Sequence, residues 1–449
     1  MNEHFGVSGE TSLAERLATR QAVVGIIGLG YVGLPLAAAC ARAGFPTVGL
    51  DVDESKITQL NAGQSYIDAV SSTDLGGYID RKRFRATADF AELSMCDVVI
   101  ICVPTPLSRY REPDLHYVEA TAETIARELR RGQLIVLEST TYPGTTEEIV
   151  KPILERKGLK SGSDFFLGFS PEREDPGNAI FKTTTIPKVV AGDGPAAASM
   201  IEAFYGAVVE SVVTVSSPKV SEAVKITENV FRAVNIALVN ELKVIYDAMG
   251  IDIWEVIDAA ATKPFGYMPF YPGPGLGGHC IPIDPFYLTW KSREYGLSTR
   301  FIELAGEINI SMPRYVLGKL ENALDRLQQV SLSSARILVL GLAYKKNVSD
   351  IRESPSFKLM EMLEARGCKV DFHDPHAAII PITREHASFA NRKSVALNRS
   401  GVQGYNAIIV ATDHDAVDYR LVAEHARLIV DTRNVFARKG ITATNLIKA

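Results

Sequence analysis

The sequence lacks the features that mark membrane, secreted or nucleic-acid-binding proteins. No apolar run approaches the roughly 20 residues that a helix needs to span a bilayer, and residues 1–22 lack the apolar segment of a secretory signal. We therefore expect a cytoplasmic protein with no membrane partner. The formal charge is −5, whereas nucleic-acid-binding proteins usually carry a basic excess, so no nucleic-acid partner is expected either.

Cysteine is scarce and scattered. The chain has Cys40, Cys96, Cys102, Cys280 and Cys368, with no CxxC pair. This odd number and spacing exclude a disulfide framework and a structural zinc site, and we predict no metal site. Four of the five lie in apolar contexts. Cys280 instead lies in "PGPGLGGHCIPIDP", whose glycines and prolines suit neither a helix nor a strand interior.

Apolar segments alternate with helical patterns in the first part of the chain and again from about residue 335. This alternation predicts parallel sheets covered by helices. We predict an α/β fold with two Rossmann-like doubly wound domains joined by a long central helix. The expected domains are a doubly wound α/β domain (1–205), a central helical dimerisation domain (206–330) and a smaller C-terminal α/β domain (331–449).

The central helix has recognisable start and stop signals. Ser217 is the expected N-cap, Pro218 the first helical residue and Gly250 the stop. The second half of this helix is too apolar for one narrow stripe, which predicts packing against several elements or against a second subunit. We expect a homodimer built on this helix.

The segment "GLGYVG" places Gly28, Gly30 and Gly33 between an apolar strand and a helix. Glycine allows the sharp turn and the close approach of a pyrophosphate, while the helix N-terminus offers free N–H groups. Asp51 ends the next strand, where a carboxylate binds a ribose diol and repels a 2′-phosphate, so NAD is favoured over NADP. Asp53 is the alternative carboxylate, and a turn without a nucleotide is the alternative interpretation.

Cys280 is a candidate nucleophile because Gly277 and Gly278 remove side chains from its approach. A hydride acceptor together with a nucleophilic thiol predicts a two-stage oxidation. An alcohol becomes an aldehyde, the thiolate adds to it, and a second hydride transfer leaves a thioester that water hydrolyses to an acid. His279 is an alternative activating base, but adjacent residues on an extended loop point apart. The alternative for Cys280 is a small buried side chain.

Further polar residues sit where a site would need them. Lys225 and Asn229 are four residues apart on the central helix and share one face, from which they can stabilise an oxyanion. Thr140 and Glu172 follow strands whose carboxyl ends face ligands in such sheets. A solvated helix face and strand-end caps are the alternatives. The acid that acts is left open among Glu172, Glu174 and Asp175.

Seven ordered blocks resemble the nucleotide-sugar 6-dehydrogenases, the UDP-glucose/GDP-mannose dehydrogenase family: "GLGYVGLP", "VPTP", "EST", "SPEREDPGN", "SEAVKITEN", "GPGLGGHCIPIDP" and "GLAYKKNVSDIRESP". The resemblance implies oxidation of a sugar C6 hydroxyl to a carboxylate with two NAD⁺, through an aldehyde, a cysteine thiohemiacetal and a thioester. It makes residues 1–205 the NAD-binding domain, 206–330 the central dimerisation domain and 331–449 the UDP-binding domain. It also makes Cys280 the nucleophile and Lys225 and Asn229 the oxyanion stabilisers. Asp284, Thr140 and Glu172 assist with water or with the lysine.

The predicted binding residues follow from these blocks. For NAD they are Gly28, Gly30, Tyr31, Val32, Gly33, Asp51, Pro104, Thr105 and Thr140. For the nucleotide sugar they are Glu172, Lys225, Asn229, Tyr271, Gly277, Lys345 and Arg352. Lys346 and Arg433 are further cations that could bind a diphosphate. The alternative interpretation, of equal weight, is that they are exposed surface charges.

The substrate is expected to be UDP-N-acetyl-D-glucosamine. The run from Ala261 to Lys291 looks most like bacterial enzymes that act on this sugar for surface polysaccharide (O-antigen) synthesis. UDP-glucose enzymes carry an arginine sixteen residues before the nucleophile, where this chain has Pro264. UDP-N-acetylmannosamine or an N-acetylgalactosamine relative ranks second and UDP-glucose third. The remote alternatives are a β-hydroxyacid dehydrogenase and a non-catalytic NAD-binding protein.

Overall fold

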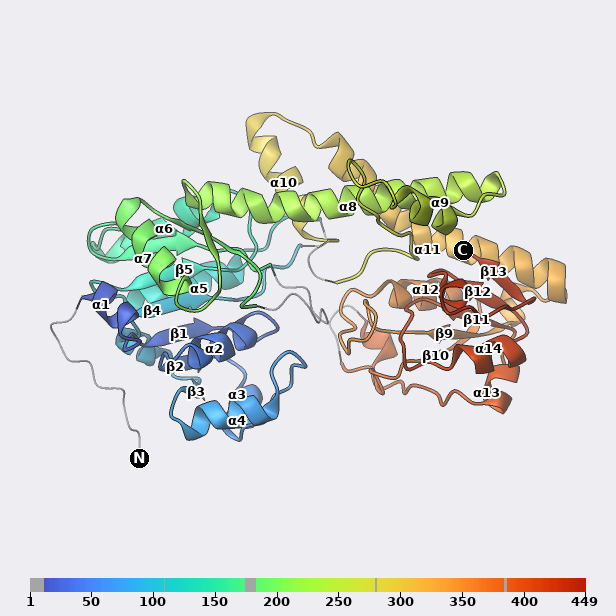
Figure 1. Cartoon of the computed structure of the whole chain (residues 1–449), viewed down its shortest axis with the longest axis horizontal. Helices are drawn as coiled ribbons and strands as arrows, with labels where there is room; N and C mark the ends of the chain where they lie inside the picture. The colour runs from blue at the N-terminus through green and yellow to red at the C-terminus, as the bar shows by residue number, and fades with distance from the viewer. Residues whose placement is uncertain (1–11, 109, 174–182, 279–280, 383–385) are drawn as a thin grey trace. The chain divides into compact units, whose positions relative to one another are not determined.

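The computed structural model describes residues 12–108, 110–173, 183–278, 281–382 and 386–449 (Figure 1). The chain divides into two compact units. The first holds the residues up to 228 together with 286–297, and the second holds 229–285 together with 298–449. Helices α8 (Pro218–Ala248) and α10 (Asp284–Ser292) contribute residues to both units. The three-domain division at residues 205 and 330 remains a prediction.

The described part of the first unit contains an 8-stranded sheet in the order β3-β2-β1-β4-β5-β6-β7-β8. Its central strands are apolar throughout and fully buried, as expected for a sheet covered on both faces. The strands are β1 (Val24–Ile27), β2 (Thr47–Leu50), β3 (Phe84–Thr87), β4 (Val98–Ile101), β5 (Leu134–Leu137), β6 (Phe166–Phe169), β7 (Lys188–Gly192) and β8 (Val212–Thr214).

One pair in this sheet departs from the predicted parallel arrangement. Strand β7 runs antiparallel to β6, and all the other neighbouring strands are parallel. A parallel pair needs a crossover connection, usually a helix. The described residues between β6 and β7 contain no helix. As a result, Lys188 at the start of β7 lies at the same edge of the sheet as the carboxyl end of β6.

Helices cover both faces of the first sheet and build two hydrophobic clusters. One cluster includes Leu34, Leu36 and Phe204, and the other includes Val118 and Ile153. The helices are α1 (Leu13–Ala18), α2 (Gly33–Arg42), α3 (Glu54–Asn61), α4 (Ser72–Asp80), α5 (His116–Glu128), α6 (Lys151–Leu154) and α7 (Pro195–Tyr205). Short turns of other helix types are η1 (Phe90–Met95), η2 (Thr146–Val150) and η3 (Glu155–Lys157).

The described part of the second unit contains a 5-stranded parallel sheet in the order β10-β9-β11-β12-β13. Its strands are β9 (Arg336–Leu340), β10 (Lys369–His373), β11 (Ala407–Val410), β12 (Ile429–Asp431) and β13 (Leu446–Lys448). Its helices are α9 (Ile253–Ala260), α11 (Arg300–Gln328), α12 (Pro355–Glu364), α13 (Arg399–Gln403), α14 (Tyr419–His425) and α15 (Val435–Arg438). Short 3-10 turns are η4 (Arg293–Tyr295, in the first unit), η5 (Leu332–Ser334) and η6 (Ala387–Phe389). The predicted α/β class is confirmed.

The long helix α8 begins and ends where the sequence predicts. The hydroxyl oxygen of Ser217 accepts the Val220 N–H at 3.4 Å, which makes Ser217 the N-cap. Pro218 is the first helical residue. Gly250 follows the helix with a φ of +74°, a left-handed conformation that glycine adopts without strain.

Candidate functional site

The predicted cofactor turn lies between β1 and α2, at the carboxyl edge of the first sheet. Gly28 has a φ of +91°, and a Cβ atom there would stand 2.5 Å from the carbonyl oxygen of Cys102, which directly follows β4. A Cβ atom at Gly33 would meet the Gly28 carbonyl oxygen at 1.9 Å. Both positions therefore require glycine for packing.

Gly30 differs from these two glycines because a Cβ atom there would meet nothing within 4 Å. Open space beside its backbone leaves room for a ligand. No side chain caps the N-terminus of α2 at Val32, and the first N–H groups of a helix have no partner within the helix itself. This is the arrangement that binds a pyrophosphate, and the turn fits NAD.

Asp51 follows β2 and is buried next to the glycine turn. Its Oδ2 atom accepts the Leu29 N–H at 2.9 Å, and Lys56 Nζ lies 3.4 Å from the same oxygen. The carboxylate therefore fixes the turn as well as facing the edge where a ribose would bind. Asp53 instead caps α3 by accepting the Ser55 N–H at 2.9 Å. This leaves Asp51 as the stronger ribose candidate.

The other predicted NAD residues follow β4 and β5 at the same edge. The hydroxyl of Ser139 donates to the Val103 carbonyl oxygen at 2.8 Å and so holds the ends of these strands together. Thr105 is half-buried, and its carbonyl oxygen accepts the Tyr287 hydroxyl at 2.7 Å. Pro104 is exposed and Thr140 is half-buried. The roles of these residues toward NAD remain predictions.

Glu172 and Lys225 are brought together in the first unit. Lys225 Nζ donates to the Glu172 carbonyl oxygen at 2.6 Å and lies 3.1 Å from its Oε2 atom. Both side chains are largely buried, with 6% and 12% of their areas exposed for Lys225 and Glu172. A cation is thus held at the carboxyl edge of the sheet, where developing negative charge could be stabilised.

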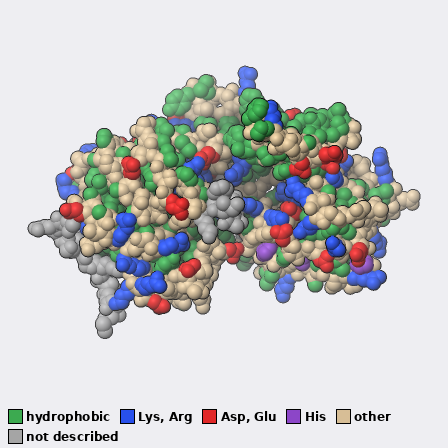
Figure 2. Space-filling view, viewed as in Figure 1, with side chains coloured by type: hydrophobic (Ala, Val, Ile, Leu, Met, Phe, Trp, Pro, Cys, Tyr) green, Lys and Arg blue, Asp and Glu red, His purple; other side chains and the backbone are tan. Residues whose placement is uncertain are grey.

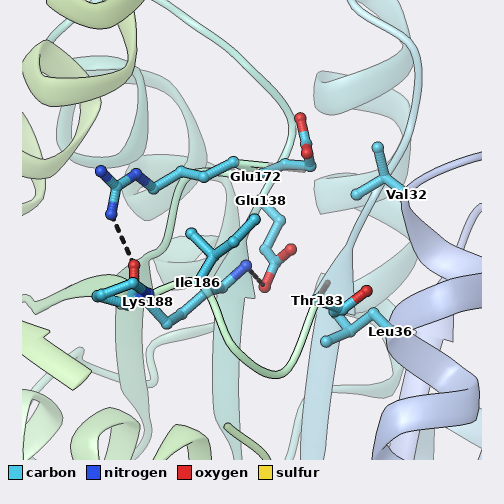
Figure 3. A pocket seen from close by; sticks show the side chains of 9 residues that line it. Val32, Leu36, Glu138, Glu172, Thr183, Ile186 and Lys188 are labelled. Atoms are coloured by element: carbon cyan, nitrogen blue, oxygen red, sulfur yellow. Dashed lines mark hydrogen bonds and ion pairs between the residues drawn. The ribbon is translucent and has the colours of Figure 1, made fainter. Parts of the chain in front are cut away.

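A pocket opens beside this pair (Figure 3). It is lined by Val32, Leu36, Glu138, Glu172, Arg173, Thr183, Ile186, Pro187 and Lys188. Two of its lining residues form an ion pair that the sequence analysis did not predict. Lys188 Nζ lies 2.9 Å from Glu138 Oε1. The sequence held a signal for a site residue, because the charged Glu138 comes directly after the apolar strand "LIVL". The structure shows that Glu138 is buried, which is unusual for a carboxylate without a partner.

Asn229 and Asp284 meet in the second unit. Asn229 Nδ2 donates to Asp284 Oδ2 at 2.6 Å, and both side chains are buried. Asp284 begins α10. The predicted nucleophile Cys280 and its neighbour His279 lie outside the described residues, as do Glu174 and Asp175.

The glycines before Cys280 have a packing role that the sequence did not indicate. A Cβ atom at Gly277 would stand 2.8 Å from Tyr344 Cβ and 2.8 Å from Pro355 Cδ. Gly278 has a φ of +82° and lies against the Tyr344 ring. The space at Gly277 is therefore occupied by protein, and a ligand could reach this residue only through its backbone.

The other predicted sugar and diphosphate residues lie in the second unit. Arg352 Nη2 lies 2.7 Å from Asp350 Oδ2, and Lys346 Nζ lies 2.8 Å from Asp415 Oδ1. Lys345 is half-buried.

Tyr271 donates its hydroxyl to Asp258 Oδ1 at 2.7 Å, and the Arg438 guanidinium lies 4.3 Å from its ring centre. Arg433 Nε donates to the Ala411 carbonyl oxygen at 2.8 Å. The structure thus gives several of the predicted residues protein partners, and their roles toward a ligand remain predictions.

In the second unit, Asp374 directly follows β10, and its carboxylate bonds to groups of the same unit. Asp374 Oδ2 accepts the N–H groups of Leu342 and Ala343 at 2.6 and 2.9 Å and lies 3.0 Å from His414 Nε2. His414 Nδ1 accepts the Asn347 N–H, so the ring proton is on Nε2. Burial opposes ionisation, but these hydrogen bonds lower the pKa of Asp374 to about 2. Asp374 therefore holds the loop that follows β9 in place.

The described cysteines do not resemble reactive thiols. Cys40, Cys96 and Cys368 are buried, and burial raises the pKa of Cys96 to about 12. Within the described ranges, no group of three or more His, Cys, Asp or Glu could hold a metal ion. The helices in these ranges are also too short or too polar to cross a bilayer.

Comparison with known proteins covers most of the chain. Family models described as the NAD binding, central and UDP binding domains of the UDP-glucose/GDP-mannose dehydrogenase family match residues 22–209, 219–311 and 338–438. The chain is 37% identical over 354 residues to a UDP-N-acetyl-D-glucosamine 6-dehydrogenase of Pseudomonas aeruginosa, covering 78% of this chain and 82% of that protein.

A second relative has a different substrate in its name. The chain is 34% identical over 419 residues to a UDP-N-acetyl-D-mannosamine dehydrogenase of Pyrococcus horikoshii, covering 92% of this chain and 95% of that protein. A solved structure of a UDP-D-ManNAc dehydrogenase from Pyrococcus horikoshii superposes with a TM-score of 0.85 at 32% identity, covering 95% of this chain and 98% of that one.

Proposed function

The chain belongs to the UDP-glucose/GDP-mannose dehydrogenase family and is an NAD-dependent oxidoreductase, and from this premise we propose that it oxidises the C6 hydroxyl of UDP-N-acetyl-D-glucosamine to a carboxylate. The observation that carries this proposal is the Lys225–Glu172 contact beside the NAD turn, within one unit. A buried cation at that edge suits a reaction in which an alkoxide develops next to a hydride acceptor.

Two hydride transfers give the acid. NAD⁺, when bound, accepts a hydride from the C6 carbon. In the first stage the alcohol loses a hydride and a proton and becomes an aldehyde. The Cys280 thiolate then adds to the aldehyde carbon, and the resulting oxyanion takes up a proton to give a thiohemiacetal. Loss of the hydroxyl proton and of a second hydride, which a second NAD⁺ would accept, gives a thioester, and water cleaves it to the carboxylic acid and the free thiol.

The chain's own residues have distinct roles in this scheme. Lys225 stabilises the oxyanion at C6 with its ammonium group, and Asn229 does so with its amide. Glu172 lies against Lys225 and, with Thr140, holds the attacking water. Asp284 orients the Asn229 amide through their 2.6 Å hydrogen bond.

The choice of sugar rests on the sequence and the relatives together. The relatives described above are named for UDP-N-acetyl-D-glucosamine and UDP-N-acetyl-D-mannosamine. UDP-N-acetylmannosamine or an N-acetylgalactosamine relative is therefore the second candidate, and UDP-glucose the third. The expected cytoplasmic location and the link to surface polysaccharide synthesis remain predictions.

We also propose a homodimer through α8. Phe231, Leu238 and Ile245 are 49%, 49% and 46% exposed and lie seven residues apart, so they form one apolar stripe on the helix. Figure 2 shows hydrophobic side chains over the C-terminal part of α8 and over α9. A second copy of the helix, lying on this stripe, would bury it.

Product stoichiometry tests the proposed reaction. The purified enzyme is assayed with UDP-N-acetylglucosamine, UDP-N-acetylmannosamine, UDP-N-acetylgalactosamine and UDP-glucose, and NADH is counted against uronic acid. We expect two NADH per acid and the highest kcat/KM with UDP-N-acetylglucosamine. One NADH per product would favour the β-hydroxyacid dehydrogenase alternative. Turnover with none of these sugars despite NAD binding would favour a non-catalytic protein.

A cysteine variant separates the two stages. Cys280→Ser removes the nucleophile, so acid formation should fall to background while NAD and the UDP-sugar still bind. Cys368→Ser is the matched control, because Cys368 is buried in the second unit and its thiol donates to the Leu332 carbonyl oxygen. Full activity in Cys280→Ser would contradict the thiol mechanism.

A further inference from the structure

We propose that Arg173 is a positioning residue that binds the Glu228 carboxylate and thereby keeps this acid from pairing with the Lys225 ammonium. Lys225 then stays on Glu172, where the oxidation needs it. The proposal rests on the role proposed above for Lys225. All four residues lie in the first unit.

Lys225 has an acidic residue one turn away on either side of α8. Glu222 precedes it by three residues, and Glu228 follows it by three. Residues at this spacing are neighbours on a helix surface, with Cβ atoms about 5–6 Å apart, and a lysine pairs with an acid there. The Lys225 side chain is only 6% exposed, and opposite charges attract more strongly in a protein interior than in water. An acid without another partner at either position would therefore compete with Glu172 for the ammonium.

Both of these acids are held by other donors. The Glu222 carboxylate accepts the N–H groups of Gly144 and Thr146 and the Thr146 hydroxyl. Glu228 is held by the Arg173 guanidinium, with Nη2 2.6 Å from Oε1 and Nε 3.3 Å from Oε2. Each carboxylate oxygen of Glu228 thus faces one nitrogen of the same guanidinium, which is the two-bond arrangement that arginine forms with carboxylates.

Arg173 directly follows Glu172 after β6. These two neighbours bind α8 one turn apart, Glu172 at Lys225 and Arg173 at Glu228. The Arg173 Nη1 atom also donates to the Pro187 carbonyl oxygen at 2.6 Å, on the segment that leads into β7. The guanidinium therefore fixes the end of β6 against α8 at the point where Glu172 meets Lys225.

The Arg173–Glu228 pair is too exposed to contribute much to the stability of the fold. Its side chains are 26% and 37% exposed, and ion pairs that water reaches add little to the free energy of unfolding. A large effect of Arg173 on turnover would therefore arise from the charges around Lys225. This difference allows a positioning role to be separated from a structural one.

Steady-state kinetics on the full chain test the inference, with NAD⁺ and whichever of the four UDP-sugars named above gives the highest kcat/KM. Arg173→Gln leaves the Glu228 carboxylate to attract Lys225, so kcat should fall about tenfold while the NAD dissociation constant changes little. Adding Glu228→Gln removes the competing charge. The double variant should therefore recover kcat to within about threefold of the wild type.

Arg156→Gln is the control, because Arg156 pairs with Glu123 at 3.0 Å on the surface of the first unit. It should keep the wild-type kcat. Urea denaturation verifies that each variant is folded. If Arg173→Gln does not fold, Arg173→Lys with and without Glu228→Gln makes the same comparison, since a lysine lacks the two-bond geometry. The expected loss and recovery are then about threefold.

A double variant as slow as Arg173→Gln would overturn the inference, because a structural role predicts no recovery. An unchanged kcat in folded Arg173→Gln would overturn it as well. Lys225→Ala separates this outcome from a failure of the proposed reaction. Wild-type turnover in Lys225→Ala would refute the role of Lys225 and this inference with it, whereas a failed recovery with Lys225→Ala still impaired would refute the positioning role alone.

Discussion

Asn229 donates a 2.6 Å hydrogen bond to Asp284, and both side chains are buried. The contact joins α8 to the first residue of α10, 55 residues further along the chain. A buried carboxylate is stable when it accepts such a bond, and a buried amide without a partner is unfavourable. The pair is therefore a sensitive point for the stability of the protein.

Asn229→Asp should place two carboxylates in contact. Repulsion would raise the folded-state pKa of the pair above its unfolded value, so the protein should lose about 3 kcal/mol of stability at pH 7 and regain part of it at pH 5. Urea denaturation at the two pH values measures this. Asn235→Asp is the control, because Asn235 lies on the same helix and its amide donates to the Phe231 carbonyl oxygen. Equal stability losses at both pH values would argue against the repulsion.

Lys225→Ala should lower kcat about 100-fold or more while changing the NAD dissociation constant little, because the role proposed for the ammonium is to stabilise developing charge. Steady-state kinetics and calorimetry report the two quantities. Lys219→Ala is the control, since Lys219 lies on the same helix, is 45% exposed and pairs with Glu148 at 3.2 Å. A parallel loss of NAD affinity and turnover in Lys225→Ala would point to a structural role instead.

Glu222 binds the loop after β5 to the start of α8. Its carboxylate accepts the N–H groups of Gly144 and Thr146 at 2.5 and 2.8 Å and the Thr146 hydroxyl at 2.7 Å. Burial dominates over these bonds and raises the pKa of Glu222 from 4.5 to about 7. The folded state therefore binds a proton more tightly than the unfolded state does.

This raised pKa predicts a stability that falls with pH. The contribution of Glu222 is complete below about pH 4.5, is lost as the pH rises to about 7, and amounts to about 3 kcal/mol in total. Denaturation at pH 5, 6, 7 and 8 measures the slope. Glu222→Gln should flatten it, although the amide loses one acceptor and lowers the stability at pH 5. A slope as steep as that of the wild type would assign the effect to other groups.

The apolar stripe on α8 predicts how the subunits associate. Leu238→Glu places a charge at the centre of this stripe and should convert a dimer to a monomer in analytical ultracentrifugation. Leu327→Glu on α11 is the control, because Leu327 is 66% exposed and lies outside the stripe. A wild type that sediments as a monomer would refute the homodimer, and a Leu238→Glu dimer would place the interface elsewhere.

Local features were predictable because neighbouring residues determine them. Gly28 takes the left-handed conformation that the predicted turn needs, and α8 begins at Pro218 and is followed by a left-handed Gly250. Strand and helix alternation predicted the α/β class. Each of these depends on backbone preferences or on periodicity within a short stretch of chain.

The antiparallel strand β7 was not predicted. Its segment has the same apolar composition as the parallel strands. The direction depends on the connection that precedes it, and an apolar run alone does not report the direction. This one reversal brings Lys188 to the carboxyl edge of the sheet, and with it the ion pair to Glu138.

The sequence by itself determined the turn chemistry, the helix ends and the residue types available for NAD and for an oxidation. Only the tertiary structure decided which of them meet. Glu138 pairs with Lys188, Glu222 holds Gly144, and Gly277 packs on Tyr344. These partners are far apart in sequence, and their contact depends on strand order and loop paths, which no local pattern encodes.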